Sequence, residues 1–352
     1  MAIDLRQICS AGMTELEDFD EVVDVRSPAE FEIDHVPGAV NCPALDNEER
    51  ARVGTIYKQV SPFEARKIGA ALVAKNVARH LDTHFATRDQ RWRPLIYCWR
   101  GGKRSASMAH VLREIGWAAA TLAGGYQSYR RAVLAQLEDL PLRFDYRVIC
   151  GPTGSGKSRL LQALAARGAQ VLDLEALAKH RGSVLGDVPG APQPSQKMFE
   201  SLVWHALRHF DAARPVFVEA ESRRIGSLRI PEHLLERMRV SPCIGIETPA
   251  AERVRFLLAE YRHLLEEPAW LKTLLLRLTA LHSRETVGRW IGQIDAGDWQ
   301  VLVADLLATH YDPAYQRSME KNYTRIADAT PIELSRLEYD EIDAGARALL
   351  LR

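Results

Sequence analysis

Short apolar runs alternate along the chain with longer segments of helical spacing. In the first part of the chain, the runs Val22–Val25, Pro94–Tyr97 and Ala120–Ala123 predict three buried β-strands. Between the second and third runs, apolar residues recur at helical spacing after Ser105, and this pattern predicts a helix that ends at Gly116. Strands that alternate with helices in this way indicate an α/β fold with parallel sheets.

The same alternation begins again after the stretch Leu137–Asp145, in which Pro141 interrupts the helical pattern. Further strands are predicted at Tyr146–Cys150, at the run that ends with Leu172, and at Pro215–Glu219. The stretch between the two series is therefore the expected domain boundary.

The chain has 352 residues, more than a single hydrophobic core usually serves, so we predict two domains. The first covers residues 1–140, and the second covers residues 141–352 with a helix-rich C-terminal region. Lys plus Arg and Asp plus Glu both number 46, so the formal net charge is zero. A nucleic-acid-binding protein of this composition needs local basic patches, because the molecule as a whole has no positive field.

The spacing of the cysteines and the hydropathy of the chain predict where in the cell the protein is located. The five cysteines show no CxxC spacing, which fits a reducing cytosol better than a disulfide or zinc framework. No apolar run approaches the roughly 18 residues that a membrane span requires. The segment Met1–Ser10 lacks the apolar stretch of a signal peptide. We expect a soluble, cytoplasmic protein that does not associate with membranes.

A loop rich in glycine and basic residues, Cys98–Ser105, lies between a predicted strand and a predicted helix. In this setting, backbone N–H groups and the helix N-terminus point into one concavity that favours an anion. Together with Arg100 and Arg104, the loop is expected to stabilise the nucleophilic thiolate of Cys98. Rhodanese domains and Cys-x5-Arg phosphatases both use such a loop, and the spacing from Cys98 to Arg104, taken alone, fits the phosphatases.

A second anion-binding motif follows the strand predicted at Tyr146–Cys150. The segment Gly151–Ser158 matches the pattern G-x-x-x-x-G-K-[ST] and has the strand–loop–helix setting that this motif requires. Its glycines allow the backbone to wrap a diphosphate, its lysine supplies a positive charge and its serine hydroxyl can hold Mg²⁺. The residues expected to bind phosphate are Gly151, Gly154, Gly156, Lys157 and Ser158.

Other polar residues follow predicted strands of the second domain. Glu219 ends a strand where P-loop proteins usually have a metal-orienting Asp, so it is a candidate for that role. Asp173, with Glu175 close behind it, is a second candidate near the carboxyl edge of the sheet, where ligands bind in such folds. Arg223 and Arg224 form either a solvated basic turn or a contact with a phosphate or with tRNA.

The P-loop motif predicts binding of phosphate groups but does not specify the rest of the ligand. No pattern in the sequence predicts a pocket for a purine base. A set of apolar residues at helical spacing is instead interpreted either as core or as the wall of a site for an apolar ligand tail. This set consists of Phe199, Leu202, Val203, Trp204, Leu207 and Phe210.

Several segments carry a family resemblance. Asp24–Phe31 and His35–Asn41 closely resemble the opening segment of rhodanese domains, and Gly124-Gly125-Tyr126 resembles their closing segment, which favours rhodanese over phosphatase. A rhodanese-like domain joined to a P-loop domain resembles the tRNA 2-selenouridine synthase family. The segments Glu49–Tyr57 and Glu219–Gly226 add to this resemblance.

The resemblance implies a transferase that converts 2-thiouridine to 2-selenouridine at the wobble position of tRNA. The sulfur is first S-geranylated from geranyl diphosphate, and it then leaves as selenium arrives from selenophosphate, which a selenophosphate-forming enzyme supplies. Cys98 would carry selenium as S-selanylcysteine, Arg100 and Arg104 would neutralise the phosphate, and Ser105 would donate a hydrogen bond. Mg²⁺ is expected at the P-loop, and no cofactor is expected to be tightly bound.

Other functions stay open when the residues alone are considered. One is a Cys-x5-Arg phosphatase, and another is an NTP-driven tRNA sulfur or selenium transferase. A non-catalytic module for sulfur transport or RNA binding is a further alternative, although the intact cysteine loop and the intact P-loop both count against it.

Overall fold

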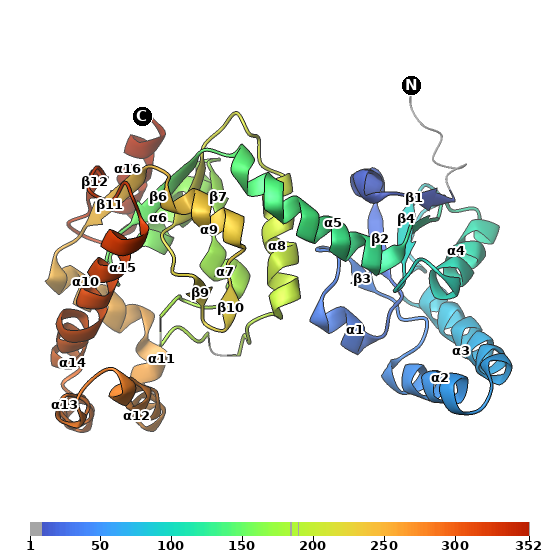
Figure 1. Ribbon diagram of the computed structural model, residues 1–352, viewed down its shortest axis with the longest axis horizontal. Helices are drawn as coiled ribbons and strands as arrows, with labels where there is room; N and C mark the ends of the chain where they lie inside the picture. The colour runs from blue at the N-terminus through green and yellow to red at the C-terminus, as the bar shows by residue number, and fades with distance from the viewer. Residues whose placement is uncertain (1–8, 184, 189, 352) are drawn as a thin grey trace. The chain divides into compact units, whose positions relative to one another are not determined.

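The computed structural model describes residues 9–183, 185–188 and 190–351, which form two compact units, each with its own parallel β-sheet (Figure 1). Unit 1 contains the described residues up to Leu137 together with Pro194–His205. Unit 2 contains Glu138–Gln193 and the described residues from Ala206 onward. The sequence pattern does not reveal that Pro194–His205, from the second half of the chain, belongs to unit 1.

Unit 1 is built on a five-stranded sheet with the strand order β1-β5-β4-β2-β3, and all of its strand pairings are parallel. The strands are β1 (Ser10–Ala11), β2 (Glu21–Asp24), β3 (Val40–Asn41), β4 (Pro94–Tyr97) and β5 (Ala120–Leu122). Every residue of the central strand β4 is buried, as expected for a parallel strand with both faces covered. The helices are α1 (Pro28–Ile33), α2 (Asn47–Gln59), α3 (Pro62–Asp82), α4 (Lys103–Ile115) and α5 (Gly125–Asp139), with a 3₁₀ turn at Met13–Asp18.

The opening segment of unit 1 is held by a buried arginine. The guanidinium of Arg26 forms an ion pair with Asp24 at 2.6 Å and lies 3.9 Å from the centre of the Tyr126 ring. It also donates a hydrogen bond to the carbonyl oxygen of Asp34 at 2.5 Å. These contacts satisfy the buried charge and join three separate segments, so Asp24 and Arg26 are scaffold residues.

The segment Pro194–His205 includes the first part of α8 (Gln196–Arg208) and is tied to unit 1 by polar side chains. The Ser201 hydroxyl donates to the Asp34 carboxylate at 2.8 Å, and the Trp204 indole N–H donates to Gln136 at 2.8 Å. The Trp204 ring also packs edge-on against Tyr129, with a centroid distance of 5.5 Å. Burial of these groups with satisfied hydrogen bonds explains why this part of α8 belongs to unit 1.

Unit 2 contains a five-stranded parallel sheet with the order β12-β11-β6-β8-β7 and a separate antiparallel hairpin, β9-β10. The strands are β6 (Tyr146–Cys150), β7 (Gln170–Leu172), β8 (Val216–Glu219), β9 (Arg224–Ile225), β10 (Leu228–Arg229), β11 (Cys243–Glu247) and β12 (Thr330–Glu333). The first helices are α6 (Lys157–Ala166), α7 (Leu174–Ala178) and α9 (Glu232–Arg239), with a 3₁₀ turn at Leu140–Arg143. Both parallel sheets confirm the predicted α/β fold.

The C-terminal third of the chain is helical, as predicted. Its helices are α10 (Ala250–Glu260), α11 (Arg262–Leu265), α12 (Pro268–Leu276), α13 (Arg284–Ala296), α14 (Trp299–Leu306), α15 (Asp312–Asn322) and α16 (Tyr339–Leu350), with shorter turns at Arg277–Ala280 and Leu307–Tyr311. Leucines of α11, α12 and α14 pack around the buried Trp290 of α13 and form a core distinct from that of the sheet. Across the described ranges, no helix combines the length and apolar character needed to cross a membrane.

Candidate functional site

The loop between β4 and α4 encloses the sulfur of Cys98. The Sγ atom accepts hydrogen bonds from the Gly102 amide at 3.1 Å and from the Ser105 hydroxyl at 3.3 Å. Burial by itself would raise the pKa of the Cys98 thiol, but hydrogen bonds from Ser105 and from the Gly102 and Arg100 amides outweigh it and lower the pKa. A lowered pKa favours the nucleophilic thiolate, as the sequence analysis predicted.

Two glycines allow the closing segment to pack directly beneath this loop. Gly101 has a φ of +66°, and a side chain there would lie 2.9 Å from the Leu122 carbonyl oxygen. Gly125 has a φ of +59°, and its Cβ would collide with the Cys98 carbonyl oxygen. The Tyr126 amide donates to that same oxygen at 2.8 Å. The closing segment therefore fixes the loop conformation that points backbone amides at the sulfur.

The loop opens into a cavity of about 450 Å³ with a basic lining. Arg100 and Arg104 both line it, and Arg104 also forms an ion pair with Glu30 at 3.3 Å. Arg50 of α2 lines the same cavity and lies 4.0 Å from Glu30. The sequence analysis did not identify Arg50, because its role depends on how α2 packs, and only the family segment Glu49–Tyr57 drew attention to this region.

The phosphate loop lies between β6 and α6 in unit 2. Its Lys157 ammonium donates to the Gly151 carbonyl oxygen at 2.9 Å and lies 3.5 Å from the Glu219 carboxylate. Gly154 has a φ of +80°, and a side chain there would meet Leu257 of α10 at 2.9 Å. The loop thus packs closely against α10, and its lysine is held by the loop's own backbone and by one acid.

Three carboxylates gather beside Ser158. Its hydroxyl donates to Glu219 at 3.1 Å and to Glu175 at 3.4 Å, and one oxygen from each of Glu175, Glu219 and Glu221 lies within 4.8 Å of the others. Burial and the neighbouring Glu219 charge raise the pKa of Glu175 to about 8. Burial also raises the pKa of Glu219 and of Glu221. Crowded oxygen ligands of this kind suit a hard divalent cation, which would relieve their mutual repulsion.

Of the two predicted metal-orienting residues, only Glu219 belongs to this carboxylate group. The Asp173 carboxylate instead accepts a hydrogen bond from the Ala176 amide at 2.9 Å and caps α7. One oxygen of this carboxylate satisfies a backbone donor at the helix start, and Asp173 still lines the cavity above the phosphate loop. Glu175, two residues further on, belongs to the carboxylate group, and a metal-orienting role for Asp173 stays a prediction.

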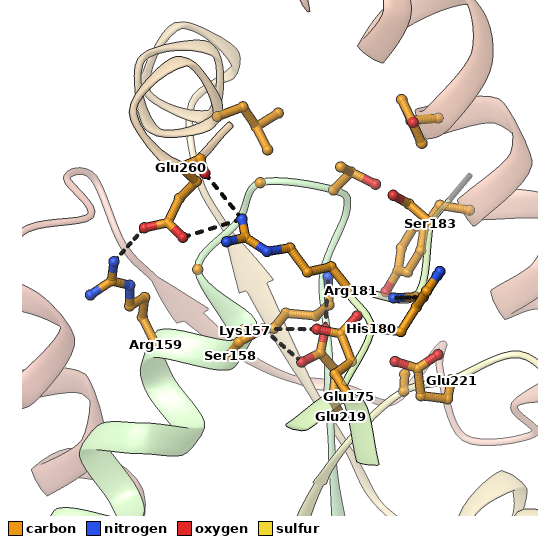
Figure 2. Close-up of a pocket in the computed structure, with 18 of the residues that line it drawn as sticks. Lys157, Ser158, Arg159, Glu175, His180, Arg181, Ser183, Glu219, Glu221 and Glu260 are labelled. Atoms are coloured by element: carbon orange, nitrogen blue, oxygen red, sulfur yellow. Dashed lines mark hydrogen bonds and ion pairs between the residues drawn. The ribbon is translucent and has the colours of Figure 1, made fainter. Parts of the chain in front are cut away.

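A cavity of about 800 Å³ lies above the phosphate loop, and charged residues stand at its rim. Arg159 of α6 and Arg181 of the loop after α7 both pair with Glu260 at the end of α10 (Figure 2). Gly182 lies over the carboxylates, since a Cβ there would be 2.6 Å from a Glu175 oxygen. The segment that carries Arg181 and Gly182 therefore covers the site formed by Ser158 and the three acids.

An apolar recess of about 60 Å³ adjoins this cavity. Thr153, Ser183, Leu257, Tyr261 and Tyr311 line both spaces, and the recess continues between leucines of α10, α11, α12 and α14. The apolar set predicted at residues 199–210 does not form this wall. Phe199, Val203, Trp204 and Leu207 are at most 1% exposed and belong to the core, which was one of the two interpretations of that set.

Arg223 and Arg224 are solvent-exposed residues on and beside the β9-β10 hairpin. The Arg223 guanidinium lies 3.7 Å from the exposed carboxylate of Glu232. Neither arginine is among the described residues that line the three cavities. The structure therefore leaves tRNA contact by these residues as a prediction.

Comparisons with known proteins match both units. Residues 11–132 match the model of the rhodanese-like domain, and residues 144–273 match the model described as the tRNA 2-selenouridine synthase AAA domain. A rhodanese-related protein from Thermoplasma volcanium is 16% identical and has a TM-score of 0.23, covering 35% of this chain and 91% of that structure. The family-model matches confirm the predicted order of a rhodanese-like domain and a P-loop domain.

Curated relatives match over both units. The tRNA 2-selenouridine synthase of Nitrosomonas europaea is 39% identical over 244 residues, which are 68% of this chain and 63% of that protein, so the match spans less than two thirds of its length. The tRNA 2-selenouridine synthase of Bdellovibrio bacteriovorus is 31% identical over 353 residues, covering 87% of this chain and 90% of that protein. That of Sulfurovum sp. is 31% identical, covering 90% of this chain and 94% of that protein. The chain belongs to the tRNA 2-selenouridine synthase family.

Proposed function

We propose that this protein converts 2-thiouridine to 2-selenouridine at the wobble position of tRNA and that it does so in two steps. The P-loop site would alkylate the sulfur, and the Cys98 site would deliver selenium. The observation that carries this proposal is the apolar recess that continues directly from the phosphate cavity. A diphosphate with a hydrocarbon tail fits that combination of surfaces.

The first step is the transfer of a geranyl group from geranyl diphosphate. The sulfur of 2-thiouridine attacks the first carbon of the geranyl group, a C–S bond forms, and the C–O bond breaks with its electron pair going to the diphosphate. The ammonium of Lys157 and the amides of the loop stabilise the negative charge that develops on the leaving group. Alkylation also turns a poor leaving group on the uridine ring into a good one.

A divalent cation fits the residues beside the loop. Ser158, Glu175, Glu219 and Glu221 would hold Mg²⁺ through oxygen atoms, and the raised pKa of the buried acids indicates that their charges lack full compensation in its absence. Bound there, the ion would neutralise part of the diphosphate charge. Lys157 would exchange its present partner, the Gly151 carbonyl oxygen, for the ligand phosphate.

The apolar lining of the recess favours a ligand with a prenyl tail over a ligand with a nucleotide base. Leu257, which touches the phosphate loop at Gly154, also lines the recess, so the apolar surface begins next to the phosphates. A volume of about 60 Å³ is far below the several hundred Å³ typical of ligand sites, so the leucines of α10, α11 and α14 would part as the tail enters. Removing the apolar tail from water would favour this opening.

The second step replaces the geranylated sulfur. Overall, selenophosphate and water give phosphate and hydrogen selenide, and the selenide displaces geranyl thiol from C2 of the uridine, so that a C–Se bond forms as the C–S bond breaks. The Cys98 thiolate would attack the phosphorus of selenophosphate, so that an S–P bond forms as the P–Se bond breaks and hydrogen selenide leaves. Water would then hydrolyse the S–P bond, and Arg100 and Arg104 would hold the phosphate in the cavity of about 450 Å³. Selenophosphate would come from a separate selenophosphate-forming enzyme in the cytoplasm.

The test incubates the protein with tRNA that carries 2-thiouridine, Mg²⁺, geranyl diphosphate and selenophosphate, and follows the nucleosides by mass spectrometry. S-geranyl-2-thiouridine should form when selenophosphate is omitted, and 2-selenouridine should form when both are present. Formation of 2-selenouridine without any geranyl donor, or only with ATP, would contradict the two-step route and favour an NTP-driven transferase.

A further inference from the structure

Helices α2 and α3 of unit 1 pack against each other as a helical hairpin (Figure 1). None of the 13 residues of α2, all of them described, is buried. Three large apolar side chains at the tip of the hairpin are exposed: Tyr57 by 57%, Val60 by 72% and Phe63 by 65%. An exposed apolar cluster of this kind on a folded protein commonly marks a binding surface.

The segment around the hairpin tip, residues 50–67 from α2 into α3, is basic, whereas the chain as a whole has no net charge. Residues 50–67 contain five Lys or Arg and one Asp or Glu, a local charge of +4. The single acid, Glu64, pairs with Lys67, so Arg52, Lys58 and Arg66 remain as exposed positive side chains. A local excess of positive charge on a neutral molecule is the patch that a nucleic-acid-binding protein of this composition needs.

One face of α2 connects the cysteine cavity with this tip. Arg50, which lines the cavity, lies one turn before Gly54 and two turns before Tyr57, so the three residues share a face. A Cβ at Gly54 would lie 3.2 Å from the Arg50 guanidinium, so the missing side chain leaves room for this arginine along the helix. Lys58 lies one turn after Gly54, so it borders the same face. The face runs from a cation at the cavity to an aromatic ring and a second cation.

We propose that this face of α2, together with Phe63, binds the unpaired nucleotides that flank the modified uridine. Exposed aromatic rings stack on splayed bases, and cations beside them contact the phosphates, which is how proteins recognise single-stranded RNA loops. The face would lead the strand toward Cys98. This inference rests on the proposed function, because it takes tRNA as the substrate, and it names the surface that receives it.

The test measures binding of the full chain to a synthetic anticodon stem-loop RNA with 2-thiouridine at the wobble position. A base-paired RNA duplex of the same length serves as the second probe. The double variant Tyr57→Ala, Phe63→Ala should weaken stem-loop binding by about tenfold, because stacking needs unpaired bases, and should change duplex binding by less than about twofold. Lys58→Glu should weaken binding of both probes and lower the salt dependence by about one phosphate contact.

The matched control is Arg52→Glu, a charge reversal on the same helix. Arg52 is exposed but follows Arg50 by two residues, which puts it on the opposite face, so its effect should stay clearly smaller than that of Lys58→Glu. Equal effects of the two reversals, or unchanged stem-loop affinity in the aromatic double variant, would overturn the inference and assign the exposed rings to a protein interface. If the unaltered chain does not bind the stem-loop, the proposed function fails as well. Unchanged unfolding midpoints would show that all variants fold.

Discussion

The cysteine loop and the phosphate loop have the same topology, but the groups at their centres carry opposite charges when ionised. Each connects the buried end of a parallel strand to the N-terminus of a helix and directs backbone amides into a concavity. In the first loop, the group at the centre is the Cys98 sulfur, and the amides and Ser105 lower its pKa. In the second, the central group is the Lys157 ammonium, which is held by a carbonyl oxygen and by Glu219.

This difference determines what each loop requires from a ligand. The cysteine loop stabilises a negative charge on its own sulfur, which favours attack on an electrophilic atom. The phosphate loop supplies the positive charge of Lys157, which is bound by protein groups in this structure. This charge can bind an anion and stabilise it as a leaving group. In the proposed two-step route, the same strand–loop–helix element would serve nucleophilic attack in one unit and leaving-group stabilisation in the other.

Replacing the central group of the cysteine loop should give the largest effect and separate the two steps. We expect Cys98→Ser to lower 2-selenouridine formation by at least about a thousandfold, because the nucleophile is lost. S-geranyl-2-thiouridine should still accumulate, since the phosphate loop is intact. Mass spectrometry of the digested tRNA measures both products. Selenouridine formation at the wild-type rate would show that Cys98 is not the nucleophile of the selenium step.

The corresponding change in the phosphate loop should block the earlier step. We expect Lys157→Ala to slow geranylation by about a hundredfold to a thousandfold, because one preorganised charge on the leaving group is removed. The variant should still form selenouridine from tRNA that is supplied already geranylated. Titration with geranyl diphosphate and with ATP checks the ligand: tight binding of ATP with none of geranyl diphosphate would refute this assignment.

The two loops should also differ in how ligand binding depends on pH. Three carboxylates lie beside the phosphate loop, whereas the residues that line the cysteine cavity include no such cluster. In the folded protein, Glu175 keeps its proton up to about pH 8, whereas its ordinary pKa is 4.5. Its contribution to the free energy of unfolding therefore falls as pH rises between these values. Mg²⁺ must displace this proton, so its affinity should rise by about tenfold per pH unit up to about pH 8.

The change in unfolding temperature on adding Mg²⁺, measured at pH 6.5 and at pH 8.5, tests this expectation. Glu175→Gln should weaken Mg²⁺ binding by about tenfold and reduce its pH dependence, while the raised pKa of Glu219 and of Glu221 maintains the rest of that dependence. Asp173→Asn is the matched control: asparagine caps a helix about as well as aspartate, so the cap of α7 and the pH dependence of Mg²⁺ binding should both stay in place. If only the Asp173 variant loses the pH dependence of Mg²⁺ binding, Asp173 and not Glu175 is the acid that holds the cation.

Local pattern was enough to predict the two loops. Strands β4 and β6 lie where the sequence analysis predicted them, because short runs of mostly apolar residues that lead into a glycine-rich loop have few other structures available. The motif residues of both loops depend on neighbours close in sequence. For the same reason, Cys98 and Lys157 could be identified as central groups without any knowledge of tertiary contacts.

The surroundings of the loops could not be predicted in this way. Helical spacing indicates that a leucine such as Leu257 faces an apolar environment, but it does not distinguish a core from a recess beside a phosphate loop. Arg50 reaches the cysteine cavity only through the packing of α2. Asp173 and Glu175 are two residues apart, and the difference between a helix cap and a ligand depends on the start of α7.

The smallest effect should come from a single hydrogen bond to the Cys98 sulfur, where the cysteine loop differs most from the phosphate loop. Ser105→Ala removes the hydroxyl that donates to Sγ at 3.3 Å, and the amide of Gly102 remains. Loss of this hydrogen bond should raise the pKa of Cys98 and lower the thiolate population at neutral pH by about fivefold, equivalent to roughly 1 kcal/mol.

The pH dependence of alkylation of Cys98 by iodoacetamide measures this shift, since only the thiolate reacts. The profile of Ser105→Ala should move to higher pH, and geranylation should be unchanged because the phosphate loop is untouched. Ser107→Ala is the matched control: its hydroxyl donates to the Lys103 carbonyl oxygen at 2.8 Å on the same helix. If Cys98 is alkylated with the same pH dependence in both variants, the backbone amides alone stabilise the thiolate. The two loops would then differ only in backbone and in central group, and not in a side-chain hydrogen bond to that group.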